Sequence, residues 1–551
     1  MKLFLLPSLL ALYVAISCTR EDINIQVIQS QAEYPVLKSK DFNNILQLKI
    51  TLADTLRETI IEKLVFSTEG TTDTEDIESA ALYYTGQKDE LINEKSVLFS
   101  ETSDISSVIT LTGSVKLNPG ANFFMFSYRL KDDSDILHRA GGLCLKAFTD
   151  HGEAVVSQPG EFRTSRFGVA VRKHNDDSAD TYRIPGLVVT NSGTLISVYD
   201  IRRDSRRDLQ GNIDIGISRS TDGGNTWGPM IVALDMGEYG GLPQKYNGVS
   251  DACLLVDSKS GNIFVAGLWM HGVIDDNGRW IENLSDTSAA WNHQWRTRGS
   301  QPGFDVKQTS QFLIAKSADD GLTWSEPVNL TRMCKKEDWW LWAPAPGNGI
   351  TLEDGTLVLP TQGRNSTGEP FSNISFSRNG GITWETSAPA YTNTTECAVV
   401  QLDDGSLMLN MRNNRNRNNE GPDNGRAVTV TGNLGETWTM HPTSQNALIE
   451  PVCMASLYKH SYLNDGNSRS ILFFSNPSTK SGRHHITIKA SLDNGNTWHE
   501  KYRLLLDEGK GNGYSCLTGV DNDHIGILYE GSQSDLVFQK IPIMDILKEL
   551  I

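Results

Sequence analysis

The chain has 551 residues and carries 50 Lys and Arg against 67 Asp and Glu, for a formal net charge of −17. That length is too great for one ordinary compact core, so it predicts several domains or one large repeat architecture. The acidic balance argues against a general nucleic-acid binder, which needs a basic face, and by itself also disfavours an anionic ligand.

Residues 1–17 have the pattern of a secretory signal. Met1-Lys2 is followed by an apolar run, Leu3 to Ile16, that is too short for a permanent membrane span. The ending Ala15 to Cys18 resembles a bacterial lipobox, in which Cys18 becomes the lipidated first residue. The alternative is ordinary cleavage nearby, with Cys18 incidental. We expect an exported lipoprotein of the periplasm or the outer membrane and cell surface, attached to a membrane only through that lipid.

Residues 18–158 read as short strands. Ile45–Ile50 alternates apolar and polar residues, which is typical of a strand with one buried face, and Phe123–Phe126 indicates a buried strand. No catalytic constellation stands out. We expect an antiparallel β-sandwich, a candidate carbohydrate-binding domain, followed by a linker over Asp150–Pro159.

Residues 159–551 contain a repeat of the form S/T-x-D/N-x-G-x-T-W. Successive Trp residues of its five copies are 97, 60, 54 and 60 residues apart, so the wide first gap holds a missed copy or an inserted loop. The copies are Ser220–Trp227, Ser317–Trp324, Ser377–Trp384, Thr431–Trp438 and Ser491–Trp498.

Each copy predicts a tight hairpin turn that packs against a neighbouring sheet. Asp or Asn can accept bonds from backbone N–H groups two residues on, Gly supplies positive φ, and Trp packs against a neighbouring sheet. A hairpin every ~60 residues is typical of a four-stranded propeller blade, and about 390 residues then predict six blades. The fold class is therefore all-β: an N-terminal β-sandwich and a six-bladed β-propeller.

No metal or cofactor is expected. The repeat lacks the ordered oxygen ligands of a calcium loop, so we interpret it as structural. The six cysteines after Cys18 are widely scattered and form no CxxC pair, which argues against a cysteine zinc site and a dense disulfide framework. We interpret them as small buried apolar residues.

Four segments depart from plain strands and turns, and they carry arginines and carboxylates. Together with the repeats, they resemble the bacterial exo-α-sialidases (neuraminidases), in particular those of the Bacteroides type, over residues 160–551. The repeated Asp boxes and the YRIP sequence carry the resemblance jointly. The segments are Tyr182–Pro185, Ile201–Asp208, Glu396 with Arg412, and Arg483 with Tyr514.

The resemblance implies an active site where the blades converge, with the Asp boxes away from it. It assigns Arg183, Arg412 and Arg483 to the three arginines that grip the substrate carboxylate, and Asp208 to the acid/base. It also implies the following matches: Glu396 and Tyr514 to the glutamate–tyrosine pair, Arg202 and Asp251 to substrate-facing residues, and Glu530 to a glutamate that braces the first arginine.

These residue types suit sialic acid, whose carboxylate is attached directly to the anomeric carbon. Arginines can hold a carboxylate through planar, bidentate bonds. A charged carboxylate nucleophile would be repelled there, whereas a neutral tyrosine is not, and sialidases are the known tyrosine-nucleophile exception among glycosidases. Tyr514 would attack, Glu396 would be its base, and Asp208 would protonate the leaving oxygen and then deprotonate water. Two displacements imply retention of configuration.

Alternatives remain open for several positions. Asp251 could only cap a turn, and Trp269 could either wall the pocket for the N-acetyl group or be core packing. The competing residues are Arg415 and Arg417 for Arg412; Arg203, Asp204, Arg206 and Arg207 for Arg202 and Asp208; Glu450 for Glu396; and Tyr502 and Tyr529 for Tyr514.

The expected function is hydrolysis of terminal α-linked sialic acids on glycoproteins, gangliosides and oligosaccharides, by a monomer. Rival functions are a trans-sialidase or intramolecular trans-sialidase, a non-catalytic glycan-binding propeller, and a metal-dependent glycosidase.

Overall fold

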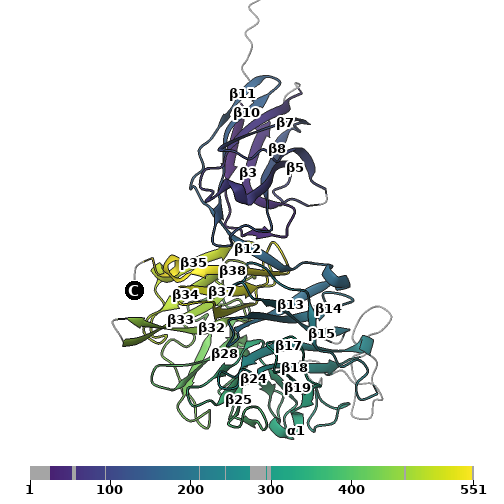
Figure 1. Cartoon of the computed structure of the whole chain (residues 1–551), viewed down its shortest axis with the longest axis vertical. Helices are drawn as coiled ribbons and strands as arrows, with labels where there is room; N and C mark the ends of the chain where they lie inside the picture. Colours follow the sequence, from purple (N-terminus) through teal and green to yellow (C-terminus); the bar gives the residue numbers. More distant parts are fainter. Residues whose placement is uncertain are drawn as a thin grey trace, which may run out of the picture.

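The structure is a computed structural model that describes residues 25–548 except 53–57, 94, 210, 242–243, 273–292, 294–299 and 465–466. The expected signal segment and Cys18 lie outside the described residues. The chain forms two lobes, a smaller N-terminal domain and a larger ring of sheets (Figure 1). Both are almost entirely β-structure, which confirms the all-β fold class. Among the described residues, no helix has the length and apolar character needed to cross a membrane.

The N-terminal domain is a two-layered β-sandwich. Its strands form one path, β6-β5-β8-β3-β1-β11-β10-β4-β7, in which the parallel pair β1–β11 joins the two layers. Phe66 of one layer stacks on Phe126 of the other, with ring centroids 4.1 Å apart. The strands are β1 (Gln26–Ser30), β3 (Asn43–Leu52), β4 (Ile60–Ser67), β5 (Ile77–Gly86), β6 (Val97–Thr102), β7 (Val108–Lys116), β8 (Gly120–Leu130), β10 (Leu143–Thr149) and β11 (Gly152–Val156).

The expected linker over Asp150–Pro159 is wrong for half of its length, because β11 lies there. A tight turn pairs Thr149 with Gly152, and β11 then runs antiparallel to β10. Ala154 is buried, so the segment completes the sandwich core. A short strand with one buried residue gave too weak an alternation to be recognised in the sequence.

The larger lobe consists of antiparallel sheets, and within the described residues the strand pairing separates them into six groups. The first two groups share one sheet only through the single pairing of Ile213 with Gly248. The first group is β13 (Thr181–Val189), β14 (Leu195–Arg202), β15 (Ile213–Ser220) and β16 (Ile231–Leu234). The second group is β17 (Asn247–Val256), β18 (Ile263–His271), β19 (Gln311–Ser317) and β20 (Val328–Asn329).

The third group is irregular at its inner edge, and the fourth and fifth are plain four-stranded sheets. The third group is β21 (Leu341–Pro344), β23 (Ile350–Thr351), β24 (Leu357–Arg364), β25 (Pro370–Ser377), β26 (Glu385–Thr386) and β27 (Tyr391–Thr392). The short strand β22 (Gly347–Asn348), between β21 and β23 in the chain, pairs in parallel with β17 of the second group instead. The fourth group is β28 (Thr394–Gln401), β29 (Leu407–Asn413), β30 (Ala427–Thr431) and β31 (Thr439–Met440), and the fifth is β32 (Ser456–Asn464), β33 (Asn467–Pro477), β34 (Ile486–Ser491) and β35 (Arg503–Asp507).

The sixth group joins the two ends of the propeller chain. Its order is β12-β38-β37-β36, so the strand that enters the propeller pairs with the last strand of the chain. The first strands of the groups lie side by side around the ring: β13 contacts β17 and β36, and β32 contacts β28 and β36. This is the arrangement of a propeller. The elements are β12 (Ser165–Arg172), β36 (Ser515–Gly519), β37 (His524–Tyr529), β38 (Leu536–Pro542) and the short helix α2 (Ile543–Leu547).

The five Asp boxes lie in the turns between the third and fourth strands of the first five groups. In each, the Ser or Thr hydroxyl accepts from the Gly N–H at 2.9–3.0 Å. The Asp or Asn side chain accepts from the Thr N–H at 2.8–3.1 Å. Trp227 packs edge-on against Phe538 of the sixth group, and Trp384 against Phe264 of the second. The boxes therefore clasp adjacent groups, as predicted.

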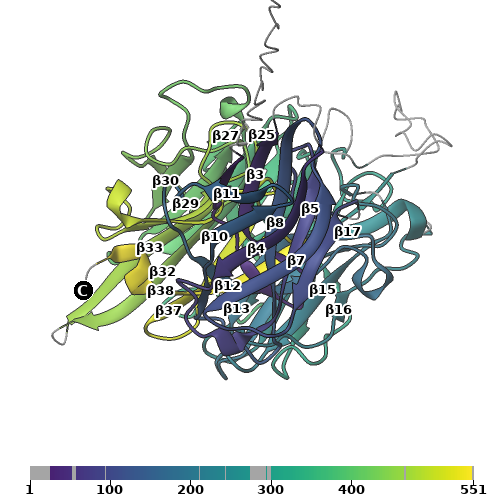
Figure 2. The same ribbon diagram turned by 90° about the horizontal axis from the view of Figure 1, so that it is seen from above.

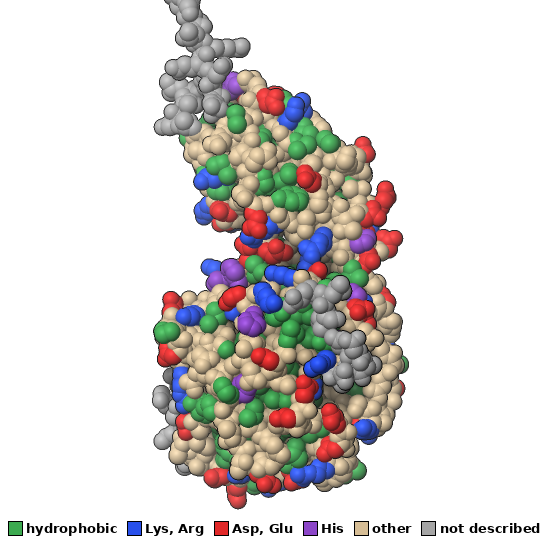
Figure 3. Space-filling view, turned by 90° about the vertical axis from the view of Figure 1, so that its left-hand side faces the viewer, with side chains coloured by type: hydrophobic (Ala, Val, Ile, Leu, Met, Phe, Trp, Pro, Cys, Tyr) green, Lys and Arg blue, Asp and Glu red, His purple; other side chains and the backbone are tan. Residues whose placement is uncertain are grey.

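The N-terminal domain is attached to the sixth group. β2 (Val36–Lys38), from the N-terminal segment, pairs in parallel with β12, and β9 (Arg139–Ala140) pairs with β12 as well. Charged side chains gather at the narrow waist between the lobes (Figure 3), where Arg139 and Arg166 both bond to Asp545 of α2. Seen from the sandwich side, the propeller extends to both sides of it, with β29–β33 on one and β15–β17 on the other (Figure 2).

The cysteines have the expected environment. All six that the structure describes are free thiols and are buried. They are Cys144, Cys253, Cys334, Cys397, Cys453 and Cys516.

Candidate active site

The candidate residues meet because the strands of the propeller alternate in direction. First strands start at one end of the ring and second strands return to it, so Arg183 near the start of β13 lies close to Arg202 at the end of β14. Glu396 near the start of β28 and Arg412 near the end of β29 repeat this relation. The Asp boxes follow the third strands and therefore lie at the opposite end.

Bulges in three first strands re-aim side chains toward this end. The pairing register shifts between Arg183 and Gly186, between Ser250 and Cys253, and between Thr394 and Cys397. Within two of these bulges, Ile184 and Asp251 have φ of 60° and 57°. Positive φ is costly for a β-branched residue such as Ile184, so other contacts must hold the segment in place.

Glu530 supplies those contacts. Its carboxylate is buried and accepts from Arg183 Nε at 2.5 Å and Nη2 at 3.3 Å, from Ile184 N at 2.9 Å and from Tyr514 N at 3.0 Å. Burial alone would raise the pKa of Glu530, but Arg183 and the two backbone donors outweigh it and hold the pKa below its ordinary value. One carboxylate thus fixes the guanidinium of Arg183 and the backbone that carries Tyr514.

Tyr514, Glu396 and Arg412 form a compact triad. The Tyr514 hydroxyl donates to Glu396 Oε1, and Arg412 Nη1 donates to Glu396 Oε2 at 2.6 Å and to the Tyr514 oxygen at 3.1 Å. Burial, together with the neighbouring Glu396, raises the pKa of Tyr514 well above its ordinary value. The phenol is therefore neutral at rest, beside a carboxylate that can take its proton and a guanidinium that can stabilise the phenolate.

Two more guanidiniums approach the Tyr514 ring. The guanidinium carbon of Arg183 lies 5.7 Å and that of Arg483 5.4 Å from the ring centroid. Arg483 is held by donation from Nη1 to Asn512 O at 2.8 Å. Arg183, Arg412 and Arg483 come from three different groups of strands and converge on one tyrosine.

A second cluster of charges lies on the first group. Arg202 is fully buried, and its Nη2 bonds to Asp208 Oδ1 at 2.7 Å and to Asp200 Oδ2 at 3.0 Å. Asp208 is the most exposed carboxylate of the site, with 69% of its side chain accessible. Burial raises the pKa of Asp200 to about 6. Burial, then the charges of Glu396 and Asp208, raises the pKa of Asp251 well above its ordinary value, so that carboxyl stays protonated to unusually high pH.

All of these side chains except Glu530 and Asp200 border one cavity of about 370 Å³, a size suited to one sugar residue. The lining residues are Arg183, Ile184, Arg202, Arg206, Asp208, Asp251, Gln362, Arg364, Thr395, Glu396, Arg412, Asn414, Arg417, Arg483 and Tyr514.

Comparison with known proteins identifies the family. Residues 193–527 match the family described as BNR repeat-like domain, and residues 24–141 match the N-terminal domain of BNR-repeat neuraminidase. A sialidase of Bacteroides fragilis (strain YCH46) is 43% identical over 456 residues, which cover 82% of this chain and 79% of that relative. The chain belongs to the bacterial BNR-repeat sialidases.

Solved structures agree with this assignment. The Hadza microbial sialidase Hz136 is 37% identical, with a TM-score of 0.83 over 94% of this chain and 100% of its own. A Trypanosoma rangeli sialidase in complex with 2,3-difluorosialic acid, described as a covalent intermediate, has a TM-score of 0.52 and 18% identity, over 69% of this chain and 59% of its own. At that identity the likeness shows the fold alone. The chain is thus a sialidase, an enzyme that hydrolyses the glycosidic bond of sialic acid.

Trp269 corrects one expectation about the sialidase pocket. Its side chain is fully buried in the core of the second group and does not line the cavity; its indole N–H donates to Asn247 Oδ1 at 3.1 Å. All nine residues of β18 are buried, and none of them lines the cavity. The interpretation as core packing is the correct one.

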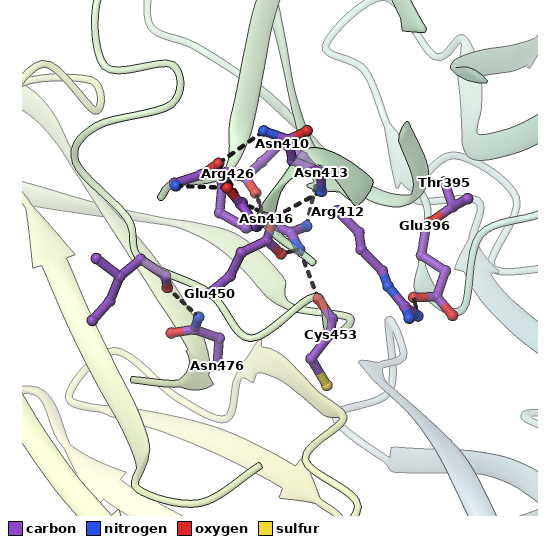
Figure 4. Close-up of polar contacts among 12 residues, drawn as sticks. Thr395, Glu396, Asn410, Arg412, Asn413, Asn416, Arg426, Glu450, Cys453 and Asn476 are labelled. Carbon is purple, nitrogen blue, oxygen red and sulfur yellow. Dashed lines mark hydrogen bonds and ion pairs between the residues drawn. The ribbon is translucent and has the colours of Figure 1, made fainter. Parts of the chain in front are cut away.

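The structure places some of the competing residues outside the pocket and others in its lining. Glu450 lies outside the pocket in a buried ion pair with Arg426 (Figure 4), and Tyr502 and Tyr529 belong to an apolar core. The sequence offers Arg206 only as an alternative to Arg202 and Asp208, and Arg417 only as an alternative to Arg412. In the structure, both arginines line the pocket together with those three residues. Gln362, Arg364, Thr395 and Asn414 also line it, and no sequence signal singled them out.

Proposed function

We propose that this sialidase acts with retention of configuration through a covalent intermediate on Tyr514. The observation that carries the proposal is the hydrogen bond from the Tyr514 hydroxyl to Glu396 Oε1, with Arg412 Nη1 2.6 Å from Glu396 Oε2 and 3.1 Å from the Tyr514 oxygen. A phenol in contact with a base and a cation is an activated nucleophile.

In the first displacement, Glu396 takes the phenolic proton and the Tyr514 oxygen attacks C2 of the sialic acid. The glycosidic bond breaks as Asp208 donates a proton to the departing oxygen. In the second, Asp208 takes a proton from water, the hydroxide attacks C2, and the Tyr514 oxygen leaves and recovers its proton from Glu396. Because each displacement inverts C2, the product keeps the α configuration.

The three arginines bind the carboxylate of the sialic acid in this proposal. Arg183, Arg412 and Arg483 present planar donors from three directions, and each charge-assisted bond contributes on the order of 1.5–3 kcal/mol. They also surround the Tyr514 ring, so the carboxylate that they hold brings C2 toward the phenol oxygen. Arg202 and Asp251 line the same cavity, and in this proposal they contact the remainder of the sugar.

Two measurements test the mechanism. Proton NMR during hydrolysis should show the α anomer of free N-acetylneuraminic acid first, with the β anomer appearing later by mutarotation. Mass analysis after incubation with 2,3-difluorosialic acid should show one added sugar on the intact protein and, after digestion, on a peptide containing Tyr514, whereas Tyr514→Phe should show none. Near wild-type turnover by Tyr514→Phe, or a β anomer formed first, would refute the proposal.

We propose terminal α-linked sialic acids of glycoproteins, gangliosides and oligosaccharides as substrates. Incubation with α2,3-, α2,6- and α2,8-linked sialosides, followed by identification of the released sugar, tests this range. Free N-acetylneuraminic acid supports hydrolysis. A 2,7-anhydro sugar or a transferred glycan as the main product would instead indicate an intramolecular trans-sialidase or a trans-sialidase.

We also propose that the enzyme is exported as a lipoprotein through Cys18. The lipobox-like sequence at Ala15 to Cys18 supports this. Labelling of cells with a fatty-acid analogue should mark the protein, and Cys18→Ala should abolish the label. Equal labelling of the variant would contradict the proposal.

A further inference from the structure

A buried ion pair lies behind the active-site pocket. Arg426 Nη1 and Glu450 Oε2 are 2.7 Å apart, and neither side chain has any exposed surface. Neither residue borders the cavity. Burying two charges costs several kcal/mol, which offsets most of their attraction, so a pair of this kind contributes little net stability. Its contacts point instead to what it holds in place.

Glu450 holds the backbone that follows Arg412. Its Oε1 accepts from Asn413 N at 2.7 Å and from Asn416 Nδ2 at 2.9 Å (Figure 4). Its backbone N–H and C=O are both bonded to the side chain of Asn424, at 2.9 and 3.0 Å. Glu450 thus ties down both ends of the loop between β29 and β30, starting at the residue next to Arg412.

Arg426 holds the strand that precedes Arg412. Its Nε donates to Asn410 Oδ1 at 2.7 Å, and its Nη1 also donates to Cys453 O at 2.7 Å. Asn410 and Asn413 flank Arg412 at two residues before and one residue after it. Cys453 packs in a small cluster with Tyr514 and Ile184, so the same guanidinium connects the Arg412 strand to the nucleophile.

Among the residues that the structure describes, Arg412 has no carboxylate partner that serves it alone, so other contacts must position it. Arg183 is held by Glu530, which does not line the cavity and has no proton-transfer role in the proposed mechanism. The carboxylate on Arg412 is Glu396, which also accepts the Tyr514 proton. In addition, Arg412 Nε is buried and has no hydrogen-bond partner in the described part of the chain.

We propose that the Arg426–Glu450 pair is a positioning device for Arg412, which fixes the backbone on both sides of that arginine so that its guanidinium meets the substrate carboxylate and Tyr514 together. The inference rests on the proposed role of Arg412 in the mechanism above. It predicts that Glu450 affects catalysis only through Arg412.

A double-mutant cycle tests this with kcat and KM for α2,3-sialyllactose, measured by released sialic acid. Glu450→Gln removes the charge and one acceptor, and kcat/KM should fall about 10-fold in the wild-type background but less than about 2-fold in Arg412→Lys. The matched control background is Arg183→Lys, because position 183 contacts Glu530 and not the Arg426–Glu450 pair; there the loss should remain about 10-fold. Arg426→Lys should retain more activity than Arg426→Met.

The proposal would be overturned if Glu450→Gln lowered kcat/KM equally in the wild-type, Arg412→Lys and Arg183→Lys backgrounds, or in none of them. This holds even if the substitution lowers the unfolding temperature. If Glu450→Gln does not fold, Asn416→Ala replaces it in the same cycle. This substitution removes one of the two donors to Glu450 Oε1, together with the two bonds between Asn416 and Gly425, and the same pattern of losses decides the outcome. Absence of hydrolysis by the wild type would count against the proposed mechanism, whereas an additive cycle in an active wild type counts against this inference alone.

Discussion

The substitution Glu530→Gln tests how far one buried carboxylate supports the active site. Each oxygen of Glu530 accepts two donors: Oε1 from Arg183 Nε and Ile184 N, and Oε2 from Arg183 Nη2 and Tyr514 N. Whichever way a glutamine amide is turned, its NH2 group faces two donors that can no longer be satisfied. The Arg183 charge also loses its buried partner.

The cost follows from these contacts. Breaking a buried ion pair by removing one partner costs about 3–5 kcal/mol, so we expect a loss of that size in the free energy of unfolding. The pKa of Glu530 is lowered in the folded state, so its stabilising contribution is present above the ordinary glutamate pKa of about 4.3 and is lost as pH falls through the lower, folded value. The difference between wild type and variant should therefore be constant near neutral pH and shrink below about pH 4.

Denaturant unfolding followed by tryptophan fluorescence measures the loss. All twelve Trp residues lie at position 227 or later, so the signal reports on the propeller and not on the sandwich. kcat/KM should fall as well, because Arg183 and the Tyr514 backbone share this brace. A stability loss under about 1 kcal/mol, or a difference that grows on acidification, would refute the reasoning.

Three further substitutions separate chemistry from packing. Asp208→Asn should lower kcat/KM on natural glycans by about 10²–10⁴-fold but far less on an aryl sialoside whose phenol leaves without protonation; equal losses would argue against Asp208 as the acid. Trp269→Phe should cost about 1 kcal/mol of stability through the lost bond to Asn247 and leave KM within about twofold, whereas a large rise in KM would return Trp269 to the pocket. Gly224→Ala should lower the free energy of unfolding by about 1–3 kcal/mol, because the added Cβ would lie 2.0 Å from the Phe538 ring at a φ of +96°. The kcat/KM of the folded enzyme should not change.

The sequence was most informative where a residue pattern has one physical cause. The Asp boxes predicted the hairpins and the ring, because their Ser, Asp, Gly and Thr positions make the same bonds in every copy. The arginines and carboxylates of the site were located by motif, and the structure brings Arg183, Arg412, Arg483, Glu396 and Tyr514 to one cavity.

Burial on both faces of a strand limited the prediction elsewhere. In β18 every residue is buried, so no alternation could tell whether Trp269 points to the cavity or to the core. Arg206 and Arg417 lie in polar loops, where sequence does not show which side chains turn inward. The parallel pairing of β2 with β12 joins segments more than 120 residues apart, and no local pattern encodes such a contact.

The closure of the sixth group has a consequence for how the enzyme is made. β12 pairs with β38, so the ring can close only when nearly the whole chain has been synthesised. The Arg183–Glu530 contact spans 347 residues across that same closure. Contacts of such long sequence separation form late in folding. Catalytic competence should therefore appear last, after the N-terminal sandwich and the earlier groups of the ring have formed.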